Sequence, residues 1–202
     1  ILAVVIVSYM TIRMIQNDSI QGSMQIYLEQ ITREIDSDYY DMIGIVNQMS
    51  PNGLIGSVTE SYLSAEDNYN RYFEQKSLRE ELIKLGYVNT KLLGIAYYDP
   101  KEQKELIGNF NVRVLDPSYQ TISKVVVGAE NIIQAMHTSY LGIRETPVLS
   151  VMRRVPFGNK RVLDIYAEIE PDMSVSDRLN KEKWPYTYME MDENGIVQYS
   201  NN

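Results

Sequence analysis

Several charged and aromatic side chains occupy strand positions from which they could hold a small ligand. Arg153 follows Met152 in an apolar run, and a guanidinium can bind a carboxylate or phosphate through two hydrogen bonds. Asp164, Tyr166 and Glu168 alternate along a second run, which places them on one face of a strand. The alternative is that these are cross-strand neighbours facing solvent. The predicted ligand-binding residues, two of them from an earlier hairpin, are Tyr97, Arg113, Arg153, Asp164 and Tyr166.

His137 is the single histidine of the chain and therefore its only imidazole for acid–base chemistry. A phosphoacceptor role would require glycine-rich nucleotide-binding segments, which the chain lacks, so we interpret His137 as a surface histidine. The chain has no Gly-x-Ser-x-Gly, no His-Glu-x-x-His and no phosphate-cradling loop. Its Ser and Asp residues cannot be grouped with the one His into a triad. We expect a non-catalytic chain without a cofactor.

An acidic group on one helical face could in principle attract a cation. Glu34, Asp38 and Asp41 recur at helical spacing, although a solvated acidic face is the simpler interpretation. The chain contains no cysteine, which excludes a disulfide framework, a thiol nucleophile and a Cys-based zinc site. We therefore expect no metal centre.

A long helix is the first element that must position these side chains. Residues 15–49 contain no proline, and Ser50-Pro51-Asn52-Gly53 then ends the pattern. Such a helix is suited to transmitting a displacement along its axis, or it merely dimerises the protein as a two-stranded coiled coil. Its apolar stripe consists of Ile20, Met24, Tyr27, Ile31, Ile35, Tyr39, Met42, Val46 and Met49.

Further helix and then strands follow the long helix. Ser77-Leu78-Arg79-Glu80 has the form of a capping box, so we expect a helix to restart there and to end at Gly86. In residues 118–144 we favour a helix followed by a loop, although Val125-Val126-Val127 also suits a strand.

The later segments predict an α+β fold: a long N-terminal helix packed on a module with a central antiparallel sheet of about five strands. Turn residues separate these strands from one another. The predicted elements are strands at 92–98, 106–114, 148–155 and 162–169, a short helix at 173–179 and a last hairpin formed by 186–191 and 196–199.

Composition limits the class of protein. The chain has 202 residues, 44% hydrophobic and 23% charged, which indicates a folded protein. The formal net charge of −8 has the wrong sign for nonspecific nucleic-acid binding. The first twelve residues are uncharged and strongly apolar, too short for a bilayer span of about 20 residues. We interpret residues 1–14 as the end of a transmembrane helix rather than a buried core helix or a signal peptide.

Three segments carry a resemblance to a known family. They are Ile31-Thr-Arg-Glu-Ile-Asp-Ser-Asp-Tyr39, Val148-Leu-Ser-Val-Met-Arg-Arg-Val155 and Met191-Asp-Glu-Asn-Gly-Ile-Val197. Together with the order of elements, they resemble the extracytoplasmic, PAS-like Cache sensor region of bacterial membrane-bound sensor histidine kinases. The resemblance implies signal reception outside the cell, dimeric packing and a cytoplasmic kinase absent from this chain. The Tyr, Arg, Trp and Asp pattern of the amino-acid-binding members is not found here.

The resemblance also implies a division of the chain and a function. We expect a truncated transmembrane helix at 1–14, a stalk helix at 15–50, a membrane-distal sensor module at 51–182 and the start of a membrane-proximal module at 183–202. The predicted function is sensing of an unidentified small molecule or peptide, with self-association through the long helix and membrane attachment through the N-terminal segment. The alternatives are a surface scaffolding or attachment protein, or the sensor of a chemoreceptor.

Overall fold

The chain divides into two compact units, Ile1–Ser37 and Asp38–Asn202, which we describe separately. The first unit holds most of one helix, and the second holds the end of that helix with all the remaining elements. The computed structural model describes residues 2–102, 104–109, 131–141, 147–158, 160–170, 189–191 and 197–200.

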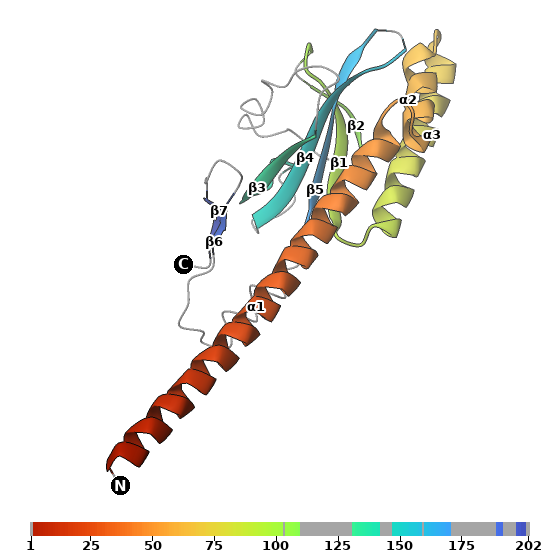
Figure 1. Cartoon of the computed structure of the whole chain (residues 1–202). Helices are drawn as coiled ribbons and strands as arrows, with labels where there is room; N and C mark the ends of the chain where they lie inside the picture. Colours follow the sequence, from red (N-terminus) through yellow and green to blue (C-terminus); the bar gives the residue numbers. More distant parts are fainter. Residues whose placement is uncertain are drawn as a thin grey trace. The chain divides into compact units, whose positions relative to one another are not determined.

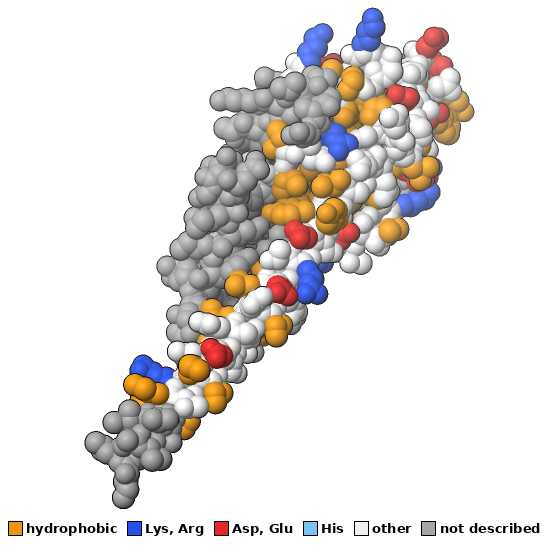
Figure 2. Space-filling model, viewed as in Figure 1, with side chains coloured by type: hydrophobic (Ala, Val, Ile, Leu, Met, Phe, Trp, Pro, Cys, Tyr) orange, Lys and Arg blue, Asp and Glu red, His pale blue; other side chains and the backbone are white. Residues whose placement is uncertain are grey.

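Helix α1 runs from Leu2 to Met49 and confirms the predicted long helix (Figure 1). In the second unit its buried residues Met42, Val46 and Met49 belong to the predicted apolar stripe. In the first unit many large apolar side chains are exposed on the helix surface, as Figure 2 shows. These exposed residues are Tyr9, Met10, Ile12, Met14, Ile15, Ile20, Ile26 and Leu28.

Within the described residues, no helix has a stretch that is both long enough and apolar enough to cross a bilayer. The division of the chain at residues 14, 50 and 182 stays a prediction.

Two shorter helices follow α1. The turn at Pro51 and Asn52 leads into α2, Leu54–Ser64, and α3 is Asn68–Val88. The join between α1 and α2 is tight, because a Cβ atom at Gly56 would lie 1.8 Å from the carbonyl oxygen of Ser50. Only glycine fits at this position without a shift of the backbone.

Helix α3 is continuous through Ser77, so the predicted restart of a helix at this residue is wrong. The helix begins ten residues earlier, where the side chain of Asp67 accepts a hydrogen bond of 2.8 Å from the amide of Asn70. Asp67 is therefore the N-cap that the capping-box pattern placed at Ser77. The helix also continues two residues beyond Gly86, to Val88.

The central sheet has five antiparallel strands in the order β2-β1-β5-β4-β3. This arrangement, with its long N-terminal helix, confirms the predicted α+β fold. The strands are β1, Leu92–Asp99; β2, Lys104–Gly108; β3, Ile132–Thr138; β4, Pro147–Pro156; and β5, Val162–Ile169.

The two faces of the sheet have different surroundings. We call the face packed against the helices of the second unit the near face (Figure 1). Its core residues include Tyr97, Val151 and Ile165, with Met42 and Leu82 from the helices. The opposite face, the far face, has a smaller buried cluster, made of Tyr98, Leu141, Met152 and Tyr166.

Strand β3 corrects the helix expected in residues 118–144. Ile132 packs against the far-face cluster, whereas the next residue, Ile133, is partly exposed, which is the alternation of a strand. The strand forms because β4 offers it an edge with which to pair, a long-range partner that local spacing does not reveal. The other residues of the expected helix, 118–130, and the following 142–144 lie outside the described residues.

The last predicted hairpin is confirmed as a two-stranded antiparallel sheet. Its strands are β6, Met189–Met191, and β7, Val197–Ser200, with Met191 opposite Val197. The predicted helix at 173–179 and the end of the second predicted strand, 110–114, lie outside the described residues.

Candidate functional site

The structure divides the four described members of the predicted ligand-binding set between the two faces of the sheet. In the β4–β5 pair Arg153 lies opposite Ile165, and Met152 lies opposite Tyr166. Because successive side chains of a strand point to opposite faces, Arg153 belongs to the near face and Tyr166 to the far face. Tyr97 shares the near face and Asp164 the far face. The fifth predicted residue, Arg113, lies outside the described residues.

Tyr97 and Arg153 hold the C-terminal end of α1 instead. The Tyr97 hydroxyl donates a hydrogen bond of 2.5 Å to the carbonyl oxygen of Met49. The Nη1 atom of Arg153 lies 2.9 Å from Oδ1 of Asn47 and 3.3 Å from Oγ of Ser50. A cation at a helix C-terminus interacts favourably with the helix dipole. We call Tyr97 and Arg153 the α1 clamp, because they fasten the last turn of α1 to strands β1 and β4.

Burial shifts the pKa values of the two clamp residues in opposite directions, yet both remain protonated hydrogen-bond donors at neutral pH. It raises the pKa of the Tyr97 hydroxyl, and a hydrogen bond with Thr59 offsets only part of that rise. Burial lowers the pKa of the Arg153 guanidinium, but a guanidinium begins so far above neutral pH that it stays charged. The Nε atom of Arg153 is buried and has no hydrogen-bond partner. The clamp is therefore charged and incompletely satisfied at physiological pH.

The far face carries a fully buried carboxylate. Oε1 of Glu168 accepts hydrogen bonds from the amides of Tyr140 at 2.7 Å and Leu141 at 3.2 Å, and from the Tyr166 hydroxyl at 2.8 Å. Its Oε2 accepts one from the Ser139 hydroxyl at 2.6 Å. Four donors satisfy a charge that would be very unfavourable if left unpaired in the interior. This carboxylate ties the turn after β3 to β5.

A second buried carboxylate on the same face forms an ion pair. Nε and Nη2 of Arg154 lie 2.6 Å and 2.8 Å from the two carboxylate oxygens of Asp164. This two-point geometry is the strongest form of an arginine–carboxylate contact. Burial and the neighbouring charge of Glu168 together raise the pKa of Tyr166, which therefore remains a neutral hydrogen-bond donor.

His137 is half-buried and hydrogen-bonded, in contrast to the surface histidine we expected. Its Nε2 lies 2.7 Å from Oγ of Ser150 and its Nδ1 lies 2.7 Å from the carbonyl oxygen of Thr138. Its ring stacks on Tyr140 with centroids 4.2 Å apart. The contact between Ser150 and His137 has the distance of a nucleophile–base pair. Ser150 is only 1% exposed, however, so a substrate could not reach its hydroxyl.

These far-face groups form what we call the far-face polar cluster: His137, Ser139, Ser150, Arg154, Asp164, Tyr166 and Glu168. The sequence pattern placed Asp164, Tyr166 and Glu168 on one face, and the structure confirms that alternation. The pattern missed the partners of Glu168 that come from the turn after β3. Backbone amides carry no residue-type signal, so only the adjacent Ser139 could have pointed to them.

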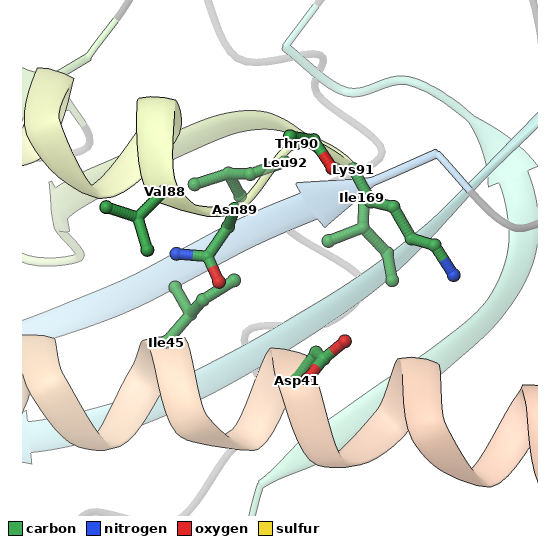
Figure 3. Close-up of a pocket in the computed structure, with 8 residues that line it drawn as sticks. All are labelled: Asp41, Ile45, Val88, Asn89, Thr90, Lys91, Leu92 and Ile169. Carbon is green, nitrogen blue, oxygen red and sulfur yellow. The ribbon is translucent and has the colours of Figure 1, made fainter.

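The predicted acidic face of α1 is divided between two environments in the second unit. Asp38 is buried and its Oδ1 lies 2.5 Å from Nζ of Lys91. Asp41 is exposed and lies at the wall of a cavity of about 280 Å³ between α1 and the connection from α3 to β1 (Figure 3). No three His, Cys, Asp or Glu side chains among the described residues are grouped so that they could hold a metal ion. Asp38 is therefore buried in an ion pair, in contrast to the solvated face we expected, whereas Asp41 is exposed.

Known proteins resemble the chain in structure rather than in sequence. No protein-family model matches the sequence, and no curated protein matches it. Among solved structures, the sensor domain of the histidine kinase DctB from V. cholerae superposes with a TM-score of 0.58. The match covers 93% of this chain and 69% of that domain, at 13% sequence identity. The two chains share a fold.

The near face and the far face both belong to the fold that the two chains share. The structural match extends over nearly the whole chain, so it includes the long helix as well as the sheet. At 13% identity it establishes a shared fold but does not transfer a ligand or any residue's role. What the site does must therefore be argued from its own groups.

Proposed function

We propose that this chain is the extracytoplasmic, ligand-sensing region of a membrane-bound sensor histidine kinase, with a PAS-like module of the Cache type. The observation that supports it is the match to a histidine kinase sensor domain over 93% of the chain. In this proposal the fragment is not catalytic, and the kinase lies in another part of the same protein. The N-terminal segment attaches it to the membrane, and α1 pairs with a second copy.

We place ligand reception on the far face. The far-face polar cluster buries two acidic side chains, Asp164 and Glu168, in positions where apolar side chains would stabilise the fold at least as well. Polar groups held this way are frequent at binding sites, because they are already oriented and desolvated. The half-buried rings of His137 and Tyr140 provide an aromatic surface beside them. A ligand that contacts the turn after β3 would act directly on the hydrogen bonds of Glu168.

Transmission to α1 passes through strands that contribute to both faces. In β4, Arg154 binds Asp164 on the far face, and the preceding residue, Arg153, contacts the end of α1 on the near face. A small rotation of this strand would change both contacts together. A ligand shifts the position of α1 only if it binds two arrangements of this strand with different affinity. The α1 clamp is thus the proposed mechanical output of the far face.

The region encoded after Asn202 tests the proposed function directly. A second membrane span followed by a linker and a histidine kinase module supports sensing by a kinase. A wall-anchoring tail or an immediate stop codon supports the scaffolding alternative and contradicts the proposal. A chemoreceptor signalling module would retain sensing and replace the kinase.

A biochemical test follows on the full-length protein in lipid vesicles. A panel of sugars, carboxylates, amino acids and short peptides is screened for compounds that raise the melting temperature, since a ligand that prefers the folded state stabilises it. A compound that stabilises the protein should change the rate of autophosphorylation, and this change should be lost in Arg154→Ala. Stabilisation without any change in autophosphorylation contradicts the proposal.

A further inference from the structure

A cavity between α1 and the connection from α3 to β1 is lined by residues far apart in sequence. It has a volume of about 280 Å³, near the lower end of ligand pockets. We call it the α1–α3 pocket, and Figure 3 shows its lining side chains arranged around an open space. The lining residues are Asp41, Ile45, Val88, Asn89, Thr90, Lys91, Leu92 and Ile169.

The floor of the α1–α3 pocket is apolar and fixed in position. Ile45, Leu92 and Ile169 are all buried and belong to the near-face core. The residues that follow β5 are also held in place, because the amide of Glu170 donates a hydrogen bond of 2.8 Å to the carbonyl oxygen of Lys91. The pocket is therefore a stable hollow that suits a short hydrocarbon body.

The pocket wall carries two acceptors, the carboxylate of Asp41 and the side-chain oxygen of Asn89, beside the Thr90 hydroxyl and the Lys91 ammonium. The carboxylate of Asp41 makes no hydrogen bond or ion pair with any described residue, and Figure 3 shows it directed from α1 toward the cavity. Nδ2 of Asn89 donates to the carbonyl oxygen of Leu85 at 2.8 Å, which leaves its Oδ1 as an acceptor. The ammonium of Lys91 is already engaged by the carboxylate of Asp38.

The electrostatic field in the pocket favours a cation. The two carboxylates of Asp38 and Asp41 against the one ammonium of Lys91 leave a negative charge at this wall. Helix α3 ends at Val88 on the pocket rim and has no basic residue in its last turn, so the negative end of its dipole is not neutralised from within the helix. The excess carboxylate charge and the dipole of α3 both favour a cation in the pocket.

From these features we propose that the α1–α3 pocket binds a small organic cation, a primary ammonium ion with a short aliphatic chain. The ammonium group lies between Asp41 and Oδ1 of Asn89, and the chain packs on Ile45, Leu92 and Ile169. This site is separate from the far-face polar cluster and does not depend on the proposed function. A bound cation bridges α1 and the start of β1, so it would brace the helix against the sheet.

A second cavity in the same unit provides an internal comparison. It has a volume of about 300 Å³ and is lined by Ile83, Gly86, Tyr87 and Asn109. Its wall contains no carboxylate and no ammonium group among these lining residues. A neutral ligand of the same size has no reason to prefer the α1–α3 pocket over this cavity.

The test is a titration of the full 202-residue chain with three probes of equal chain length, followed by amide NMR. The probes are n-butylammonium, 1-butanol and butyrate. We expect saturable shifts of the Asn89, Thr90 and Lys91 amides with n-butylammonium. Binding of 1-butanol should be weaker by up to about fivefold, as expected when one partly exposed ionic contact is lost. Equal affinities for the three probes, or no saturable shift with n-butylammonium, would overturn the proposal.

Three variants separate the pocket from general charge effects. Asp41→Asn should weaken n-butylammonium binding by up to about fivefold. Asp36→Asn, the same change at an exposed position of α1 outside the pocket, should leave the affinity unchanged. Val88→Trp, at a rim position that is 79% exposed, should block the pocket without disturbing the core. Wild-type affinity in Asp41→Asn or Val88→Trp, or equal losses in Asp36→Asn and Asp41→Asn, contradicts the proposal.

Discussion

The two faces of the central sheet differ in what they bury. The near face buries mainly aliphatic and aromatic side chains, and two of its polar side chains, Tyr97 and Arg153, contact the end of α1. The far face buries two carboxylates, Asp164 and Glu168, each with several hydrogen-bond partners. Buried apolar side chains stabilise a fold without needing specific partners. A buried charged side chain does so only while its hydrogen-bond and ion-pair partners stay in place.

Because of this difference, the two faces are suited to different roles. The near face is suited to holding helices, and it holds α1 by a small number of directional contacts. The far face is sensitive to small displacements, because moving the turn after β3 removes donors from Glu168. A sheet built this way can report a change on one face through the other. Each prediction below tests one side of this contrast, from the largest expected effect to the smallest.

The largest effect is expected from Glu168→Ala on the far face. The substitution leaves the hydroxyls of Ser139 and Tyr166 and two backbone amides without their acceptor. Breaking a buried charged network in this way should lower the free energy of unfolding by about 3–5 kcal/mol. Chemical denaturation measures it, with Glu66→Ala at an exposed position as the control, for which we expect a change within about 0.5 kcal/mol. Equal stability of the two variants would remove the contrast between the faces.

A smaller effect is expected from Tyr97→Phe on the near face. The ring still packs in the core, but the carbonyl oxygen of Met49 loses its donor. The loss of one buried hydrogen bond should lower the free energy of unfolding by about 1–2 kcal/mol. Tyr87→Phe, at a position that is 81% exposed, should change nothing measurable. If the Tyr97 and Tyr87 variants are equally stable, the clamp does not fasten α1.

Arg153→Ala should have a local effect on the end of α1. Removing the guanidinium takes a cation from the helix C-terminus and two hydrogen bonds from Asn47 and Ser50, with a loss of about 1 kcal/mol. Hydrogen exchange should become faster at the amides near Ser50 and stay unchanged in β5. Arg79→Ala, at an exposed position of α3, is the matched control. Uniform acceleration over the whole second unit would show a loss of global stability instead.

The smallest effect at neutral pH concerns one tyrosine from each face. Burial raises the pKa of both Tyr97 and Tyr166, and Glu168 adds to the rise for Tyr166. Because the folded-state pKa is the higher one, the folded protein retains these protons. Their contribution to stability is therefore present below the unfolded pKa of about 10 and is lost as the pH rises above it. In an absorbance titration these two hydroxyls should ionise only on unfolding, and Tyr166→Phe should reduce the alkaline loss of stability.

The fold was largely predictable from local pattern. Alternation along 148–155 and 162–169 and the turn between them predicted β4 and β5, and the long unbroken helical spacing predicted α1. Strand β3 was not predictable, because Ile132, Ile133 and Met136 also fit a helical period, and only pairing with β4 decides the outcome. The N-cap of α3 was misplaced because Ser77 mimics a cap inside a continuous helix.

The candidate site was less predictable, because it depends on strand register. Residue types and spacing alone do not decide whether Arg153 shares a face with Tyr166. The hairpin closes with Pro156 opposite Val162, which pairs Met152 with Tyr166 and turns Arg153 to the other face. A shift of register by one residue would have reversed the assignment. The backbone donors of Glu168 and the link between Arg153 and α1 are likewise products of tertiary structure.

Hydrogen exchange in the presence of a stabilising compound tests the central claim most directly. The claim is that a ligand binds the far face and that β4 and the α1 clamp carry its effect to the end of α1. With a compound that raises the melting temperature, the account predicts slower exchange in residues 131–141 and an altered rate at Asn47 to Ser50. Protection that leaves residues 131–141 unchanged would contradict it.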